Sequence, residues 1–175
     1  NGLEVAIIGA NTSSKNKDVA NGLLSTKDFS GVTIMDARVV TPSLNELKKF
    51  DSVLVYNNFK YRDSEKLGNN LADYAEQGGG VVTMVFESST RLGSTRPLQG
   101  RWKSKNYGVF SSSSSDTRNW NYLGNVLQKN HPIVKDFNSF KGYYRMNKKA
   151  VANNSTLIAN WKDGIPLVAC RKNNV

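Results

Sequence analysis

Cysteine and histidine are almost absent from this sequence. Its 175 residues include one cysteine, Cys170, and one histidine, His131. A single cysteine excludes an internal disulfide bond and favours a reducing compartment such as the cytoplasm. The few nitrogen and sulfur ligands and the scattered carboxylates show neither the spacing of a zinc site nor that of a calcium-binding loop. We therefore expect no metal site and no cofactor.

Long hydrophobic runs are also missing. The longest apolar stretches have the length of a strand, well short of the roughly 20 residues that a membrane-spanning helix needs. Hydrophobic residues make up 38% of the chain and charged residues 22%, which is ordinary for a globular protein. We therefore expect residues 1–175 to form one domain with no membrane span.

Acidic residues are too few to balance the basic ones, and the net charge is +10. The basic residues are spread along the chain, one or two together, as at Lys48-Lys49 and Arg171-Lys172. No basic helix, RNP-like strand or zinc pattern accompanies them. The charge therefore favours solubility, and weak binding to a polyanion or nucleic acid is the less favoured alternative.

The first half of the chain alternates strand and helix patterns. Asp18, Pro42-Ser43 and Asp63 or Ser64 are the expected helix starts, and Gly78 is expected to stop the last helix. Apolar strands joined by helices predict a mainly parallel sheet covered on both faces, which is an α/β fold. The expected strands are "LEVAII" (3–8), "GVTIMD" (31–36), "DSVLVYNN" (51–58) and "VVTMVF" (81–86).

The second half is less regular. Residues 88–118 are rich in serine, glycine and basic residues, so we expect a long polar excursion over the surface, held down by its aromatic residues. Asp116 is expected to cap a helix that carries Trp120, Leu123, Val126 and Leu127. Two apolar runs at 156–161 and 165–170 flank Asp163-Gly164, which predicts a C-terminal β-hairpin.

The order of these parts resembles a known family. The helix ending "LADYAEQGGG", a buried strand, a long loop, "HPIVKDF" and "ANWKDGIPLVA" follow one another as in the class I glutamine amidotransferase-like superfamily, and most closely as in its ThuA-like branch. The resemblance covers roughly residues 3–170. It implies a flavodoxin-like three-layer α/β/α sandwich with its site at the carboxyl end of the strand after the glycines. Family members carry a further strand, so it also implies that this chain lacks the last strand of the fold.

The position of the family's nucleophile does not suit that chemistry. It falls at about Val85, or at Phe86 or Glu87 with a small shift, and none of these is a cysteine. No glycine flanks the turn to permit a strained nucleophile elbow. Cys170 lies in the expected hairpin, where it is interpreted as a small buried hydrophobic residue. We therefore do not expect glutaminase activity.

His131 is the only histidine for acid–base catalysis. One hypothesis pairs it with Glu87 or Ser88 in a hydrolase of carbohydrates or ester-like compounds. The other interpretation is a structural turn, in which the His131 ring makes a local hydrogen bond and Ile133 and Phe137 pack inward.

Ligand-binding residues are expected at the carboxyl edge of the sheet, where ligands of α/β proteins bind. The loop at 9–18 offers backbone N–H groups and hydroxyls to an anion, and aromatic residues follow the third strand and occupy the long loop. The candidates are Asn11, Thr12, Ser13, Tyr56, Asn57, Asn58, Phe59, Tyr61, Glu87, Trp102 and Tyr107. The favoured function is a non-catalytic interaction or ligand-binding domain, for a protein or for a small polar ligand such as a carbohydrate.

Overall fold

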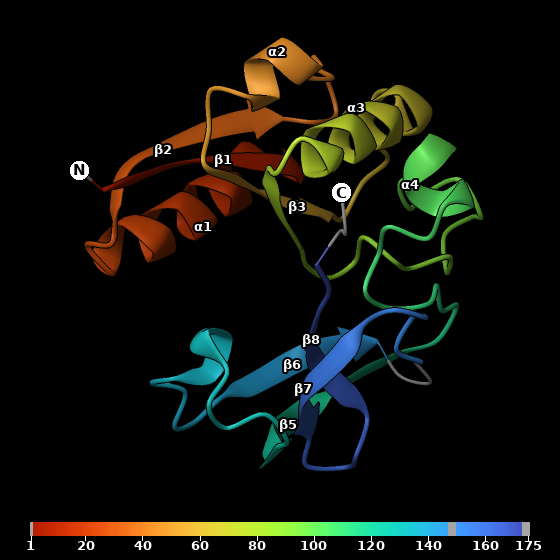
Figure 1. The fold of residues 1–175 in the computed structure, drawn as a ribbon. Coiled ribbons are helices and arrows are strands. Elements are labelled where there is room, and N and C mark those ends of the chain that lie inside the picture. The colour runs from red at the N-terminus through yellow and green to blue at the C-terminus, as the bar shows by residue number, and fades with distance from the viewer. Residues whose placement is uncertain (1, 147–149, 173–175) are drawn as a thin grey trace.

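The computed structural model describes residues 2–146 and 150–172 and has an α/β fold built on two sheets. A parallel sheet has the strand order β2-β1-β3-β4, and a separate antiparallel sheet has the order β6-β5-β7-β8. The two sheets occupy opposite ends of the molecule, and the connection from β4 to β5 passes between them through α4 (Figure 1). The α/β prediction is thus confirmed, whereas a separate four-stranded antiparallel sheet is present where only a C-terminal β-hairpin was expected.

The parallel sheet follows the apolar runs. Its strands are β1 (Leu3–Ala10), β2 (Phe29–Asp36), β3 (Ser52–Asn57) and β4 (Gly80–Thr83). Each neighbouring pair in this sheet is parallel, with β1 between β2 and β3. Because successive side chains of a strand point to opposite faces, the apolar residues of β1 and β3 supply two hydrophobic layers.

Helices cover both faces of this sheet. They are α1 (Ser13–Ser25), α2 (Leu44–Leu47) and α3 (Ser64–Glu76), followed later by α4 (Gly100–Ser104). On one face, α2 and α3 pack against the strands in the larger core, which includes Ile8, Val53 and Leu71. On the other face, α1 packs through Ala20 onto Ile7.

Helix ends agree with most of the expected signals. Asp63 caps α3 by accepting a 2.9 Å hydrogen bond from the backbone N–H of Lys66, and Gly78 follows the helix with a φ of 90° that favours glycine. The expected start of α1 at Asp18 is wrong. Thr12 caps this helix through the N–H of Lys15, at 3.4 Å, so the polar loop after β1 is already helical at Ser13.

The expected helix after Asp116 is also wrong. Residues Asp116–Val126 form the long strand β5, which pairs antiparallel with β6 (Lys141–Met146) and with β7 (Thr156–Trp161). The spacing of its apolar residues fits a helix, but pairing on both sides gives this β-branched and aromatic-rich segment a sheet environment instead. The last strand, β8 (Pro166–Cys170), pairs antiparallel with β7, so both lie in the four-stranded antiparallel sheet.

Residues 88–118 do more than cross the surface. Leu98 and Trp102 of this segment are buried in the core beside α3, and Ser89 forms a bridge to Ser113. Gly68 of α3 lies so close to α4 that an added Cβ would overlap the carbonyl oxygen of Gln99. The segment thus covers the carboxyl edge of the parallel sheet. It is held there because its few large apolar residues, Leu98 and Trp102, pack against α3 although most of the segment is polar.

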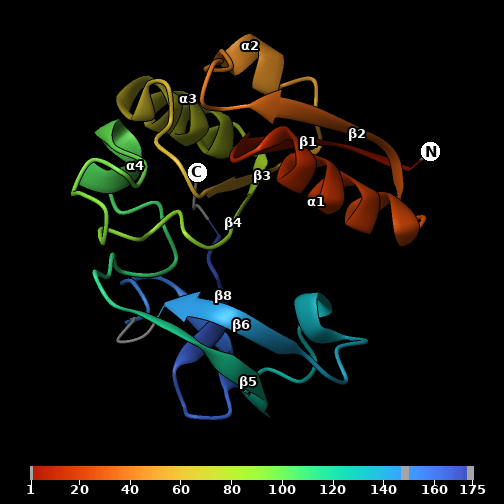
Figure 2. The same cartoon turned by 180° about the vertical axis from the view of Figure 1, so that it is seen from behind.

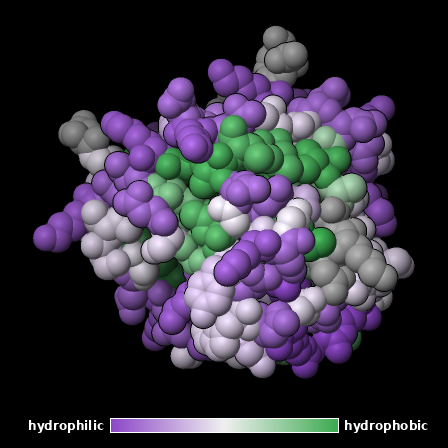
Figure 3. Space-filling model, turned by 90° about the horizontal axis from the view of Figure 1, so that it is seen from below, coloured by the Kyte–Doolittle hydropathy of each residue, from purple (hydrophilic) through white to green (hydrophobic). Residues whose placement is uncertain are grey.

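The two views in Figure 1 and Figure 2 place α4 and the 3-10 turn η1 (Pro132–Val134, cyan) on opposite sides of the molecule. From below, which is the side of the antiparallel sheet, an apolar stretch is bordered by hydrophilic side chains (Figure 3). Within the described ranges, no helix has the length and apolar character needed to cross a membrane.

Candidate functional site

Two adjoining cavities lie where β4 ends and the segment 88–118 begins. Their volumes are about 300 and 410 Å³, which fall within the range of roughly 300 to 1,000 Å³ typical of small-molecule sites. Glu87, Ser88, Gly108 and Phe110 line both cavities. The cavities thus meet at the strand end where the family resemblance predicted a site.

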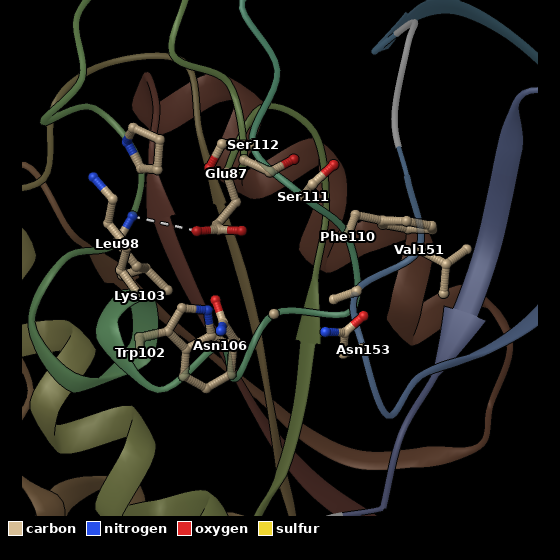
Figure 4. A pocket seen from close by; sticks show the side chains of 14 residues that line it. Glu87, Leu98, Trp102, Lys103, Asn106, Phe110, Ser111, Ser112, Val151 and Asn153 are labelled. Carbon is tan, nitrogen blue, oxygen red and sulfur yellow. Dashed lines mark hydrogen bonds between the residues drawn. The ribbon is translucent and has the colours of Figure 1, made fainter.

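Glu87 is the acidic residue of this region. Its side chain is only 6% exposed, and Oε1 accepts a 3.2 Å hydrogen bond from the backbone N–H of Leu98. A hydrogen bond of 2.9 Å from its own N–H to the carbonyl of Met84 fixes the turn after β4. In Figure 4 the carboxylate lies between Leu98 on one side and Phe110 on the other, in the middle of the lining residues of the smaller cavity.

Trp102 forms the floor of the smaller cavity. It is 6% exposed, comes from α4, and stacks on Tyr107 with ring centroids 5.6 Å apart. Its indole nitrogen lies 3.8 Å from the place that a Cβ would take at Gly108, a residue of the cavity wall. Among the described residues, the indole N–H has no hydrogen-bond partner. A buried donor of this kind costs free energy until an acceptor reaches it.

Ion pairs hold α4 and its tryptophan against α3. The guanidinium of Arg101 binds Asp73 and also Glu76, the latter with a separation of 2.6 Å. The hydrogen bonds from Arg101 and from the Tyr107 hydroxyl lower the pKa of Glu76. Arg101 also donates its backbone N–H to Asn69 Oδ1 at 2.8 Å. The position of Trp102 is therefore set by a second helix and not by its own loop alone.

A buried polar cluster lies on the sheet side of the cavities. The amide of Asn57, at the end of β3, donates to the carbonyl of Arg96 at 3.0 Å, and the Arg96 guanidinium donates to the carbonyl of Asn58. Burial, and then the charge of Glu87, raises the pKa of Tyr61 well above its ordinary value. Within the described part of the chain, the Tyr61 hydroxyl and Arg96 Nε have no hydrogen-bond partner.

The larger cavity has an aromatic wall from the antiparallel sheet. Phe140, Tyr144 and Trp161 line it, together with Val85 of the turn after β4. Arg145 also lines it. Arg145 is 5% exposed, its guanidinium lies over the Trp161 ring at 5.8 Å, and it pairs with Asp163 at 2.7 Å. This cavity therefore combines flat apolar surfaces with one buried cation whose charge is already compensated.

The structure gathers some of the predicted residues and separates others. Glu87, Ser88 and Trp102 line the cavities, and Asn57, Asn58 and Tyr61 belong to the polar cluster beside them. Tyr107 supports Trp102 by stacking. The remaining candidates, which line neither cavity, are Asn11, Thr12, Ser13, Tyr56, Phe59 and His131.

Each of these separated residues has a structural setting of its own. Asn11 accepts a 2.8 Å hydrogen bond from the Thr12 N–H in front of α1, so this loop serves helix capping. Tyr56, expected near the ligand edge, is instead buried on the α1 face, where its hydroxyl donates to Asn16 Oδ1 at 2.5 Å. Phe59 is exposed and lies under Arg38 at 5.6 Å.

His131 stands at the start of η1, not at the strand end. Its Nδ1 accepts the backbone N–H of Ile133 at 3.3 Å, and its Nε2 lies 3.4 Å from the sulfur of Cys170. The expected local hydrogen bond of the ring is therefore present. The expected inward packing of Ile133 is wrong, because this side chain is 53% exposed.

Sequence reasoning missed the two buried arginines of this region, Arg96 and Arg145. Arginine is rarely buried, so no pattern in the sequence distinguishes these two from the exposed basic residues. It also missed Leu98, whose backbone N–H binds Glu87. The only available signal was the Pro97-Leu98 pair, the only aliphatic or proline residues between Gly93 and Trp102.

Among the described residues, no group of three or more histidine, cysteine, aspartate or glutamate side chains is placed to hold a metal ion. Comparison with known proteins finds no family model that matches the chain and no similar curated protein. The fold is similar to a solved structure described as the cytoplasmic protein STM3548 from Salmonella typhimurium. The two are 10% identical, with a TM-score of 0.66 over 95% of this chain and 82% of the other. At this identity the likeness shows a shared fold and nothing of function.

Proposed function

We propose that this chain is a ligand-binding domain that holds a small hydroxyl-rich molecule, of the size of a mono- or disaccharide, without transforming it. One observation carries the proposal. The buried, unpartnered indole N–H of Trp102 and the carboxylate of Glu87 line the same cavity at the carboxyl edge of a parallel sheet. A hydroxyl group can accept from the indole N–H and donate to a carboxylate oxygen, whereas a purely apolar ligand leaves the indole N–H without an acceptor.

The other lining residues support the same class of ligand. Asn106, Ser111, Ser112 and Asn153 add amides and hydroxyls to the smaller cavity. The aromatic wall of the larger cavity, with Tyr144 and Trp161, offers flat apolar surface next to these polar groups. A pocket with apolar walls and a few convergent polar groups is typical of sites that orient a small ligand.

The position of His131 supports binding rather than hydrolysis. It lines neither cavity and interacts with Ile133 and Cys170. A general base must come within hydrogen-bond reach of the reacting group, directly or through one water molecule. The turn after β4 offers Val85, Phe86 and Glu87 in place of a cysteine nucleophile.

The scaffold is best interpreted as an amidotransferase-like, flavodoxin-like sandwich whose catalytic residues are missing. The helix that ends before Gly78, the edge strand β4 that follows it and the helices on both faces of the parallel sheet support this interpretation. The single cysteine and the structural likeness to a protein described as cytoplasmic support a cytoplasmic location.

Calorimetric titration with a panel of mono- and disaccharides tests the proposal. At least one sugar is expected to bind the natural chain, and Trp102→Phe is expected to weaken that binding about 3- to 10-fold, since one hydrogen bond contributes about 0.5–1.5 kcal/mol. Trp120→Phe is the matched control, because Trp120 is exposed and lines neither cavity. Failure of the whole panel to bind, or equal effects of the two variants, would count against the proposal.

A further inference from the structure

The outer face of the β5–β6 ribbon carries exposed aromatic rings. Trp120 is 58% exposed, Tyr122 54% and Tyr143 40%, whereas Trp102 and Trp161 are each 6% exposed. Aromatic side chains usually bury most of their surface, so a group of three on neighbouring strands indicates an interaction surface.

These rings share one side of the ribbon. Trp120 contacts Tyr143 with ring centroids 5.4 Å apart, and Tyr122 lies directly opposite Lys141 in the strand register. Gly142 and Tyr144 line the larger cavity, whereas Lys141 and Tyr143, which alternate with them in β6, do not. We call the surface formed by Trp120, Tyr122, Lys141 and Tyr143 the aromatic–basic face.

Cations are interleaved with the rings. Lys141 Nζ lies over the Trp120 ring at 5.2 Å, and the exposed residue Lys162 is joined to the ribbon by a 2.9 Å hydrogen bond from its N–H to the carbonyl of Tyr122. Neither lysine forms an ion pair among the described residues, and two of the three carboxylates in residues 88–175 are paired with arginines: Asp116 with Arg91 at 2.8 Å and Asp163 with Arg145 at 2.7 Å. The two lysines therefore keep an uncompensated positive potential beside the rings.

The charge of the whole chain is concentrated in the same part. Residues 88–175 hold 15 of the 24 basic residues but only three of the 14 acidic residues, so the excess of positive charge belongs to this part alone. Such an asymmetry within one chain is typical of proteins that bind nucleic acid or anionic surfaces. The basic residues appear dispersed in the sequence, but the antiparallel sheet brings two of them next to the aromatic rings.

We propose that the aromatic–basic face binds single-stranded nucleic acid. Bases stack on Trp120, Tyr122 and Tyr143, while Lys141 and Lys162 lie near the phosphates. Stacking on aromatic residues beside a positive surface is how proteins hold single strands without reading their sequence. A duplex hides the faces of its bases, and an acidic polysaccharide has none, so neither makes full use of these rings. The proposal does not depend on the cavities, which lie on the other side of the ribbon.

Fluorescence anisotropy with labelled oligothymidylate and oligouridylate at low salt tests this proposal. Trp120→Ala and Tyr143→Ala are each expected to weaken binding about 5- to 150-fold, whereas Trp120→Phe keeps a stacking ring and loses less. Lys141→Gln is expected to weaken binding and to reduce the slope of log affinity against log salt by about 0.7. Phe59→Ala, which removes an exposed ring from the parallel half, is the matched control and leaves binding unchanged.

Several results would overturn the proposal: no binding of either oligonucleotide, equal loss in Phe59→Ala and Trp120→Ala, or tighter binding of a duplex than of a single strand. Binding of heparin that is insensitive to Trp120→Ala, without binding of the oligonucleotides, would show a charge-driven polyanion surface instead. The two proposals can fail separately. If sugar binding responds to Trp102→Phe but not to Trp120→Ala, the ligand site in the cavities stands whatever the result for nucleic acid at the aromatic–basic face.

Discussion

Gly68 is the point where α3 meets α4, and replacing it by alanine sets two effects against each other. Alanine is the better helix former by about 1 kcal/mol in a helix interior. At Gly68, however, the new Cβ would overlap the backbone carbonyl oxygen of Gln99 and lie 3.2 Å from the Cβ of Trp102. The overlap is with backbone, so α4 must move as a unit.

Overpacking of this kind costs about 1–3 kcal/mol, and more where backbone must shift. Because backbone must shift here, we take the upper part of this range, about 2–3 kcal/mol. Subtracting the gain of about 1 kcal/mol in helix propensity, we expect Gly68→Ala to lower the free energy of unfolding by about 1–2 kcal/mol. For a chain of this length the melting temperature should fall by about 2–8 °C, as measured by circular dichroism. Because Trp102 moves with α4, sugar binding should weaken as well.

Gly22 provides the control. It also lies within a helix, α1, but a Cβ built there has nothing within 4 Å. Gly22→Ala should therefore raise the melting temperature by about 2–4 °C through helix propensity alone. If Gly68→Ala stabilises the protein as much as Gly22→Ala does, the close packing of α4 on α3 is refuted.

Two further predictions concern Tyr56 and His131. Tyr56→Phe removes the hydroxyl that donates to Asn16 Oδ1, so the free energy of unfolding measured by urea denaturation should fall by about 1–3 kcal/mol. An unchanged urea concentration at the midpoint of unfolding would contradict a stabilising role of this buried hydrogen bond. Burial, helped by the charge of Asp18, raises the pKa of Tyr56 to about 12 from 10, so the unfolded chain ionises first and stability should fall between pH 10 and about 12. The same decline in Tyr56→Phe would show that another group causes it. His131→Ala should leave sugar affinity unchanged, because His131 lies outside both cavities; turnover of nitrophenyl esters or glycosides that disappears in this variant would instead establish a hydrolase.

The parallel half of the fold was predictable because its signals are local. Continuous apolar runs of strand length, Asp63 at the start of α3 and Gly78 after its end each have one dominant physical interpretation. The antiparallel half was not predictable in the same way. The spacing of Trp120, Leu123 and Val126 suits a helix as well as a strand, and the choice is made by β6 and β7, which are distant in sequence.

The candidate site was predictable in its place but not in its composition. The glycine turn and the strand after it resemble those of the amidotransferase-like family, whose site follows this strand. That resemblance pointed to Glu87, which lines both cavities. Arg96 and Arg145 were missed because burial of an arginine depends on tertiary partners such as Asn58 and Asp163. Tyr56 was expected near the ligand edge, because the strand pattern alone does not show that this side chain packs on the α1 face.

The most direct test of ligand binding at the strand end is the indole N–H signal of Trp102. The chain has three tryptophans, so Trp102→Phe identifies this signal in a proton–nitrogen correlation spectrum. On titration with the saccharide panel, we expect the Trp102 signal to shift with ligand concentration and the Trp120 signal to stay in place. A panel that leaves the Trp102 signal unmoved, or that shifts only the Trp120 signal, would contradict the account of the site.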